Sequence, residues 1–306
     1  MKKFVAYIVL LLLVFPELGR AQQDPLYTNY MFNPMAINPA YAGSRDALSM
    51  VALGRWQWVG VDGAPNTQSF AIHSNVGKTG LALGGNFCHE GIGPNSNFTG
   101  QLTIGYHVKL KLGKLSFAAR AGVFHSVLDK NQLIFNQIND PTNSGGFTSA
   151  TVPTFDFGMY WYTKNFYVGA GANNIYAGRI DFNVNADYVV HQLTQHFYLH
   201  GGAAFEVHPN FVLKPSAMLR YVINAPFSFD VNFSVLMYKI LWLGVTYRFN
   251  NSVAFLLELN PLDWLRIGYS FDFTYTSTVF RKGSHEVFLG FDFNVHTKKT
   301  TSPRFL

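Results

Sequence analysis

Hydrophobic and polar residues alternate one by one along many stretches of this chain. Between residues 227 and 237, phenylalanine, valine and methionine alternate with serine, aspartate and asparagine. The stretches 102–110, 265–275 and 287–295 follow the same rule. A period of two puts successive side chains on opposite faces of a strand, whereas an amphipathic helix needs apolar residues at i, i+3, i+4 and i+7. The pattern therefore predicts β-strands with one apolar and one polar face.

The pattern predicts fourteen strands, whose connections alternate in length. The strands are expected at 46–58, 66–76, 79–89, 96–112, 113–126, 153–163, 165–174, 194–206, 209–222, 226–238, 240–250, 252–260, 262–275 and 284–295. Connections after even-numbered strands are short, whereas 127–152 and 175–193, after odd-numbered strands, are long. Bacterial barrels have short periplasmic turns and longer outer loops. We therefore expect an N-terminus in the periplasm and a barrel wall over 46–295, although tight outer connections near 224–225 and 250–251 leave the count open by one hairpin.

The composition favours a membrane wall over a soluble β-sandwich. Hydrophobic residues make up 48% of the chain and charged residues only 13%, whereas a soluble domain carries about 25% charged residues. In hydrocarbon each unpaired backbone group costs several kcal/mol, so an open sheet edge is untenable and the strands must close into a barrel. Tryptophans near the strand ends are expected to form an aromatic girdle at the membrane surface. They are Trp56, Trp58, Trp161, Trp242 and Trp264.

The first 21 residues have the features of a secretory signal peptide. Two lysines precede the 12-residue apolar run 4–15, and Gly19 and Ala21 supply small residues at the −3 and −1 positions, which predicts cleavage after Ala21. The run is too short to span a bilayer as a helix, and no later stretch reaches the required length. We expect the mature chain to be integral to the outer membrane of a Gram-negative bacterium, with residues 296–306 as a basic C-terminal tail.

The charged residues do not indicate nucleic-acid binding, because much of the net charge of +6 lies near the two chain ends. Eight charged residues fall on the polar faces of strands: Arg120, Asp156, Asp230, Arg248, Glu258, Arg266, Asp272 and Asp292. They are interpreted as ion-paired residues that face the lumen, in preference to paired carboxylates of an active site. His196 and His200 would lie roughly 13 Å apart along one strand, too far for one metal ion. We expect no enzymatic activity, cofactor or metal.

The segment 22–45, between the signal and the first strand, does not follow the strand pattern. Its three prolines exclude a long strand, and its four aromatic residues and two methionines need a place to be buried. The segment could plug the lumen, pack beneath the periplasmic mouth or dock a partner. We favour the plug or periplasmic floor.

The stretch 30–43 resembles the opening signature of the PorP/SprF family of outer-membrane proteins. The residues that carry the resemblance are Tyr30, Met31, Phe32, Asn33, Pro34, Asn38, Pro39, Ala40, Tyr41 and Gly43. Shorter similarities follow in the family's order at 57–60, 166–169, 213–216 and 265–269. The resemblance implies a component of the type IX secretion system that helps to export or anchor large surface proteins, such as gliding adhesins, through their C-terminal sorting domains. It also implies other secretion components as partners.

A barrel of fourteen strands is too narrow to pass a folded adhesin, since even 16–18-stranded porins leave only an aqueous channel. We therefore expect the protein to dock its partner on the long loops, while membrane lipid and lipopolysaccharide surround the wall. The expected docking anchors are Phe135, Phe147, Ile175, Tyr176, Phe182 and Tyr188. The alternative function is that of a plugged diffusion channel or a transporter of apolar solutes.

Overall fold

The computed structural model describes residues 27–133, 145–176, 178–182, 190–223, 225–276 and 283–293. The first half of the wall consists of β1 (Leu48–Trp56), β2 (Asn66–Asn75), β3 (Leu81–Ile92), β4 (Asn95–Lys109), β5 (Lys114–Asp129), β6 (Phe147–Tyr162) and β7 (Phe166–Asn173). The second half consists of β10 (His196–Ala203), β11 (Phe205–His208), β12 (Phe211–Val222), β13 (Ser228–Met237), β14 (Leu241–Arg248), β15 (Ser252–Leu262), β16 (Leu265–Thr274) and β17 (Ser284–Phe293).

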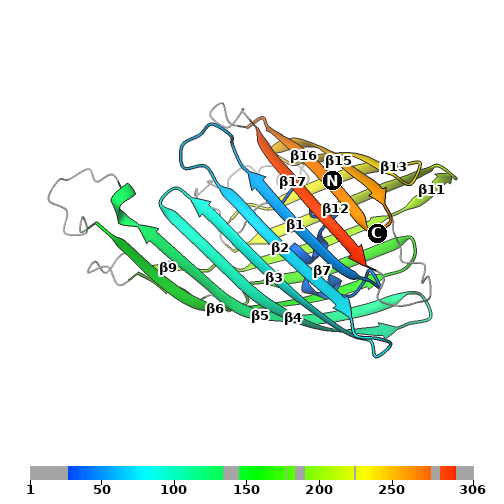
Figure 1. Ribbon diagram of the computed structural model, residues 1–306, viewed down its shortest axis with the longest axis horizontal. Coiled ribbons are helices and arrows are strands. Elements are labelled where there is room, and N and C mark those ends of the chain that lie inside the picture. The colour runs from blue at the N-terminus through cyan, green and yellow to red at the C-terminus, as the bar shows by residue number, and fades with distance from the viewer. Residues whose placement is uncertain are drawn as a thin grey trace, which may run out of the picture.

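These strands form one closed antiparallel barrel (Figure 1). Each strand pairs with its neighbours in sequence, and β1 closes the ring by pairing with β17 from Leu48↔Phe293 to Trp56↔His285. The segments β10 and β11 are consecutive halves of one wall strand interrupted at Ala204, so the barrel has 14 strands. This confirms the predicted strand count, which the tight connections near 224–225 and 250–251 had left open by one hairpin.

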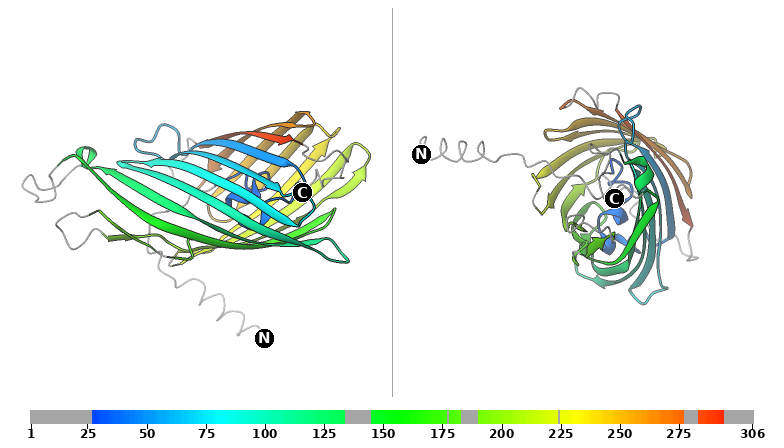
Figure 2. Two further views of the ribbon diagram at one scale, coloured as in Figure 1. Left: turned by 60° about the horizontal axis from the view of Figure 1, so that its bottom comes forward. Right: turned by 90° about the vertical axis from the view of Figure 1, so that its left-hand side faces the viewer.

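The barrel has a short-turn end and a long-loop end. The short-turn end carries the connections 76–80, 110–113, 163–165, 209–210, 238–240 and 263–264, and the long-loop end carries all the others. At the long-loop end, β4, β5 and β6 are 15, 16 and 16 residues long, and they project beyond their neighbours (Figures 1 and 2). The expected loop 127–152 is therefore wrong at both ends, because strands occupy 127–129 and 147–152. We call residues 95–100, 123–129 and 147–153 the tall wall.

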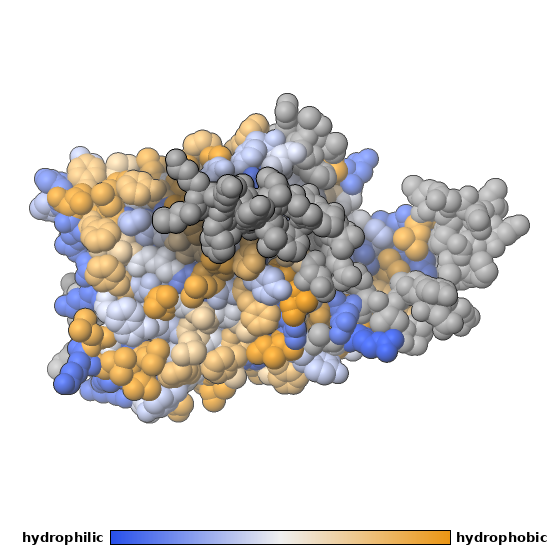
Figure 3. All heavy atoms as spheres, turned by 180° about the vertical axis from the view of Figure 1, so that it is seen from behind, coloured by the Kyte–Doolittle hydropathy of each residue, from blue (hydrophilic) through white to orange (hydrophobic). Residues whose placement is uncertain are grey.

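Alternate side chains point outward and inward along each strand. Phe229, Val231 and Phe233 of β13 are 42–53% exposed on the outside, while Asp230 and Asn232 between them are 1% exposed. Apolar side chains cover much of the middle of the face in Figure 3, with hydrophilic ones toward its two ends. Trp242 is an exception to the predicted aromatic girdle, since it points into the lumen and is only 3% exposed.

The N-terminal segment from residue 27 lies inside the barrel, where it is drawn in blue in the right-hand view of Figure 2. Two short 3-10 helices, η1 (Pro34–Ala36) and η2 (Pro39–Tyr41), each begin with a proline, which suits the first position of a helix because its missing amide needs no partner there. The side chain of Asn38 caps η2 by accepting the amide of Ala40 at 3.0 Å. We call residues 27–44 the plug.

Smaller elements lie at the long-loop end. They are the 3-10 helix η3 (Lys130–Gln132) and a two-stranded sheet of β8 (Arg179–Asp181) and β9 (Val190–Gln192). Val152 of the tall wall packs there with Ile180, Phe182 and Leu193. Within the described residues, no helix has both the length and the apolar character needed to cross a bilayer.

Candidate functional site

The plug runs through the lumen from one end to the other. Near its described start, Thr28 and Asn29 are hydrogen-bonded to the long-loop ends of β16 and β17. After Gly43 the chain reaches the short-turn end, where Asp46 pairs with Lys114 at 3.1 Å. The expectation of a periplasmic N-terminus therefore applies to the start of β1 but is wrong for the described start of the chain. Alternation along the strands gave no information on the path of the segment before them.

Buried charges hold the upper part of the plug, which is the part nearest the long-loop end of the barrel. The carboxylate of Glu286 accepts the backbone amides of Thr28 and Asn29 at 3.0 and 2.9 Å. The Thr28 hydroxyl donates to Asp272 at 2.6–2.7 Å. Arg55 bridges both acids, with N···O distances of 3.1 Å to Glu286 and 2.9 Å to Asp272. Arg55 also donates to the Thr28 hydroxyl at 3.0 Å. The plug is thus tied by charge-assisted hydrogen bonds to three wall strands, through its backbone to β17 and through the Thr28 hydroxyl to β1 and β16.

This network continues along the wall through β14 and β13. Arg248 lies 3.9 Å from Asp272 and forms a closer pair with Asp230, at 3.0 Å. We call Arg55, Asp230, Arg248, Asp272 and Glu286 the upper network. Its side chains are at most 3% exposed. Breaking such a buried pair by removing one partner typically costs 3–5 kcal/mol, because it leaves a buried charge uncompensated.

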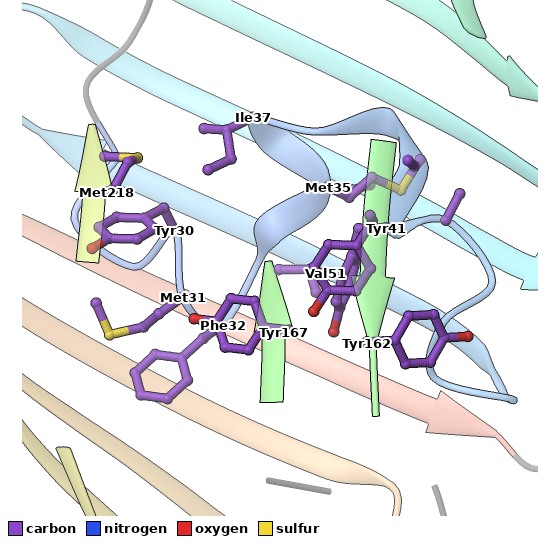
Figure 4. Packing of buried hydrophobic residues seen from close by; sticks show 14 of the residues in the cluster. Tyr30, Met31, Phe32, Met35, Ile37, Tyr41, Val51, Tyr162, Tyr167 and Met218 are labelled. Atoms are coloured by element: carbon purple, nitrogen blue, oxygen red, sulfur yellow. The ribbon is translucent and has the colours of Figure 1, made fainter. Parts of the chain in front are cut away.

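Aromatic packing fixes the middle of the plug (Figure 4). The ring of Phe32 lies between those of Trp242 and Phe288, with centroid distances of 6.3 and 5.9 Å. Tyr41 meets the ring of Tyr160 edge-on at 5.5 Å. The lumen is therefore apolar around the middle of the plug, rather than uniformly polar as in a water-filled barrel.

Glycines of β6 and β7 give the plug room to approach the wall. Asn38 donates to the carbonyl of Met159 at 3.0 Å and lies 3.2 Å from Nε2 of His200. A Cβ atom on Gly169 would lie 2.7 Å from the Asn38 amide nitrogen and 2.5 Å from His200. A Cβ on Gly158 would overlap the Asn38 amide oxygen. Only glycine at these two positions leaves space for the Asn38 side chain against the wall.

Ion pairs also lie at the short-turn end of the plug, where Arg45 directly follows its last residue. Asp292 contacts Arg45 at 3.0 Å and Arg266 at 2.9 Å, and Arg266 also donates to the carbonyl of Phe32 at 3.3 Å. Burial alone would lower the pKa of Arg45, but the Asp292 carboxylate, together with Tyr41 and Glu258, outweighs burial and holds that pKa above its ordinary value. Burial raises the pKa of Tyr30, whose hydroxyl stays neutral.

A third pair lies beside the plug, where Arg120 contacts Asp156 at 2.6 Å and donates to the carbonyl of Met35 at 2.9 Å. A cavity of about 90 Å³ adjoins this pair, with room for a few water molecules.

The structure places all eight predicted lumen charges inside the barrel, and seven of them belong to the ion pairs described above. Glu258 is the eighth, 3% exposed on β15. All ten motif residues from Tyr30 to Gly43 are buried in the plug. The sequence interpretation missed Arg55 and Glu286 as contacts of the plug. The sequence does show each of them as an isolated charged residue within a predicted strand. Only the β1–β17 register, in which Arg55 faces Glu286, shows that the two form a pair beside the plug.

The predicted docking anchors fall into three groups. Phe147, Ile175 and Tyr176 are 70, 45 and 55% exposed at the long-loop end. Phe182 is only 7% exposed because it packs in the cluster with Val152 and Ile180, so it offers no free surface as an anchor. Phe135 and Tyr188 lie outside the described residues. Among the described residues, no three His, Cys, Asp or Glu side chains form a metal site.

A closed barrel with an apolar outer face and a lumen filled by its own N-terminal segment defines a plugged outer-membrane β-barrel. Comparison with known families then identifies the kind of barrel. The model of the family described as "Type IX secretion system membrane protein PorP/SprF" matches residues 19–291. The chain therefore belongs to the PorP/SprF family, which confirms the resemblance seen in the sequence. No curated protein matches the chain.

A solved outer-membrane transporter shows the same type of fold at low sequence identity. The toluene transporter TbuX of Ralstonia pickettii has a TM-score of 0.51 and 10% identity, over 91% of this chain and 96% of that one. The outer membrane protein Omp33 of Acinetobacter baumannii has a TM-score of 0.48 and 9% identity, over 81% of this chain and all of that one. The family and fold place the protein in the outer membrane. Its short-turn end is accordingly periplasmic and its long-loop end extracellular.

Proposed function

We propose that this protein is a plugged docking barrel of the type IX secretion system, which holds an exported surface protein at its extracellular end. The observation that carries the proposal is the plug. Its backbone is bonded to Glu286, Arg120 and Arg266, on three different wall strands. A lumen tied shut at its top, side and base suits a rigid anchor better than a conduit.

The extracellular end supplies the docking surface in this proposal. Phe147 at the tip of β6 and Ile175 and Tyr176 after β7 expose apolar side chains there. Tyr176 is braced by an edge-on contact with Phe155 at 6.5 Å. Exposed aromatic residues on a rigid scaffold are typical anchors of protein interfaces. The partner we propose is the C-terminal sorting domain of a large exported protein, with gliding adhesins as one such class.

The competing function is a diffusion channel or a transporter of apolar solutes. It requires a continuous path through the lumen, whereas the cavity beside the plug at Arg120 and Asp156 has a volume of about 90 Å³. Membership of a secretion family also favours docking. The other secretion components are proposed to meet the periplasmic end, where Lys114 and Asp46 lie beside the turns.

Surface display in living cells tests the docking function. Cells that lack the protein are expected to lose their exported surface proteins from the cell face, and the wild-type gene restores them. A triple Phe147→Ser/Ile175→Ser/Tyr176→Ser variant should insert normally but fail to restore display. The matched control is Phe233→Ser, which changes a 53% exposed side chain in the middle of β13, away from the loops. Normal display in cells lacking the protein would overturn the proposal.

A further inference from the structure

Within the described residues, the strand β6 has one unpaired edge at the extracellular end of the barrel. It pairs with β5 along its whole length, from Asp129↔Phe147 to Lys114↔Tyr162. Its other edge pairs with β7 only from Phe157↔Ala172 to Tyr162↔Tyr167. Among the described residues, no strand pairs with β6 residues 147–154 on that second edge. A barrel normally has no free edge, so this one is an exception that the tall wall creates.

Alternation of the backbone identifies the groups on this edge. The carbonyl of Gly146 accepts the amide of Lys130, toward β5, whereas the carbonyl of Phe155 accepts that of Ile175, on the other side. Because successive residues of a strand point their backbone groups to opposite edges, odd-numbered residues face the open edge. Ser149 and Thr151 therefore direct both an amide and a carbonyl outward.

Pro153 marks the lower limit of this edge. It also has an odd number, so the amide that proline lacks would have faced the open edge and not β5. Proline in a strand is tolerated only where no ladder bond is needed. The Val123↔Pro153 pairing on the β5 side is accordingly intact. The window for a further strand is 147–152, above the point where β7 ends.

Residues 147–152 of β6 are held in place by contacts with the rest of the protein. On the inner face, Val152 is buried against Ile180 and Leu193, and the Thr148 hydroxyl donates to the carbonyl of Phe182 at 2.6 Å. On the outer face Ser149 and Thr151 are exposed. Thr151 also hydrogen-bonds His125 of β5 at 2.7 Å. The open edge is thus a held strand, not a loop that must be ordered when a partner arrives.

We infer that the open edge of β6, residues 147–152, binds an extended segment of an exported protein as an additional β-strand. Alternating amides and carbonyls along a straight edge are matched only by another extended backbone, and such strand addition is a recurrent mode of peptide recognition. The edge stands on the extracellular side, so an exported polypeptide reaches it and a periplasmic one does not. The inference rests on the proposed docking function and names its contact.

Proline substitution separates backbone pairing from side-chain contact. In Ser149→Pro/Thr151→Pro, both changes remove amides that face away from β5, so the barrel should fold, as its heat-resistant migration on gels will show. The matched control, Ser149→Ala/Thr151→Val, changes the same side chains but keeps both amides. The probes are purified C-terminal sorting domains of the proteins that this secretion system exports, titrated against the barrel in detergent.

The inference predicts that a sorting domain binds the wild type and the alanine/valine control alike, and the proline variant at least tenfold more weakly. Equal binding to all three proteins would overturn strand addition while leaving docking intact. Equal loss in the proline variant and the control would also overturn it, because side chains would then carry the contact. If no sorting domain binds the wild type, both strand addition and the proposed function fail. Dimers that form through this edge, with sorting domains bound equally by all variants, would assign the edge to a second copy.

Discussion

The bond between the plug backbone and Glu286 should be the main lock at the extracellular end, and Glu286→Gln tests it. The carboxylate accepts two plug amides, those of Thr28 and Asn29, through its two oxygens. A glutamine offers one acceptor oxygen, so one buried amide is left without a partner. It also removes the charge that pairs with Arg55 at 3.1 Å.

The size of the effect follows from these losses. Removing one member of a buried ion pair costs about 3–5 kcal/mol. Arg55 keeps its second partner, Asp272, at 2.9 Å, so we expect the lower end of this range, about 3 kcal/mol. Since about 1.4 kcal/mol is a factor of ten in an equilibrium constant, local opening of the upper plug should become roughly 100-fold more frequent.

Hydrogen exchange followed by mass spectrometry measures this opening directly. Peptides that begin near Tyr27 should exchange roughly 100-fold faster in Glu286→Gln, while peptides of the wall strands stay protected. Asp230→Asn is the matched control, because Asp230 is also buried and ion-paired, but with Arg248 rather than with the plug. Wild-type exchange in Glu286→Gln, or an equal acceleration in Asp230→Asn, would refute the role given to Glu286.

Two further predictions concern how the plug packs. Gly169→Ala should displace the plug and accelerate hydrogen exchange of its amides, because the new Cβ would lie 2.5 Å from His200. The control Gly91→Ala should behave as wild type, because nothing lies within 4 Å of its added atom. Equal hydrogen exchange in the two variants would contradict the close approach of the plug to Gly169. Phe32→Ala should lower the free energy of unfolding by about 3–5 kcal/mol in urea titrations of the refolded protein. The control Phe233→Ala, at a 53% exposed site on the outer face, should lower it by clearly less. Equal losses in the two variants would place Phe32 outside the core.

The wall was predictable because every strand has one face toward lipid. This requirement makes apolar and polar residues alternate with a period of two along each strand. The same logic explains where the prediction stopped short. Residues 147–152 of β6 belong to the tall wall, which projects beyond the neighbouring strands at the extracellular end. Their small and hydroxylated side chains, such as Ser149 and Thr151, lack the contrast that marks a membrane strand.

The lumen was predictable in its charges but not in its apolar contacts. Trp242 reads as a residue of the aromatic girdle from its place near the end of a strand, yet it packs against Phe32 of the plug. Val51 and Leu53 of β1 likewise face inward and are 5% exposed. Where a lumen-facing residue packs against an apolar plug it is itself apolar, so the sequence does not distinguish it from a lipid-facing residue. The path of the plug depends on contacts between residues more than 200 positions apart, such as Thr28 and Glu286.

The central claim, that the N-terminal segment closes the barrel, is tested most directly by electrical conductance across planar lipid bilayers. The wild-type protein should insert without opening steady channels, and a variant that lacks residues 22–44 should insert and conduct in discrete steps. Steady open steps from the wild type, with the same size after the deletion, would contradict the account and favour a diffusion channel.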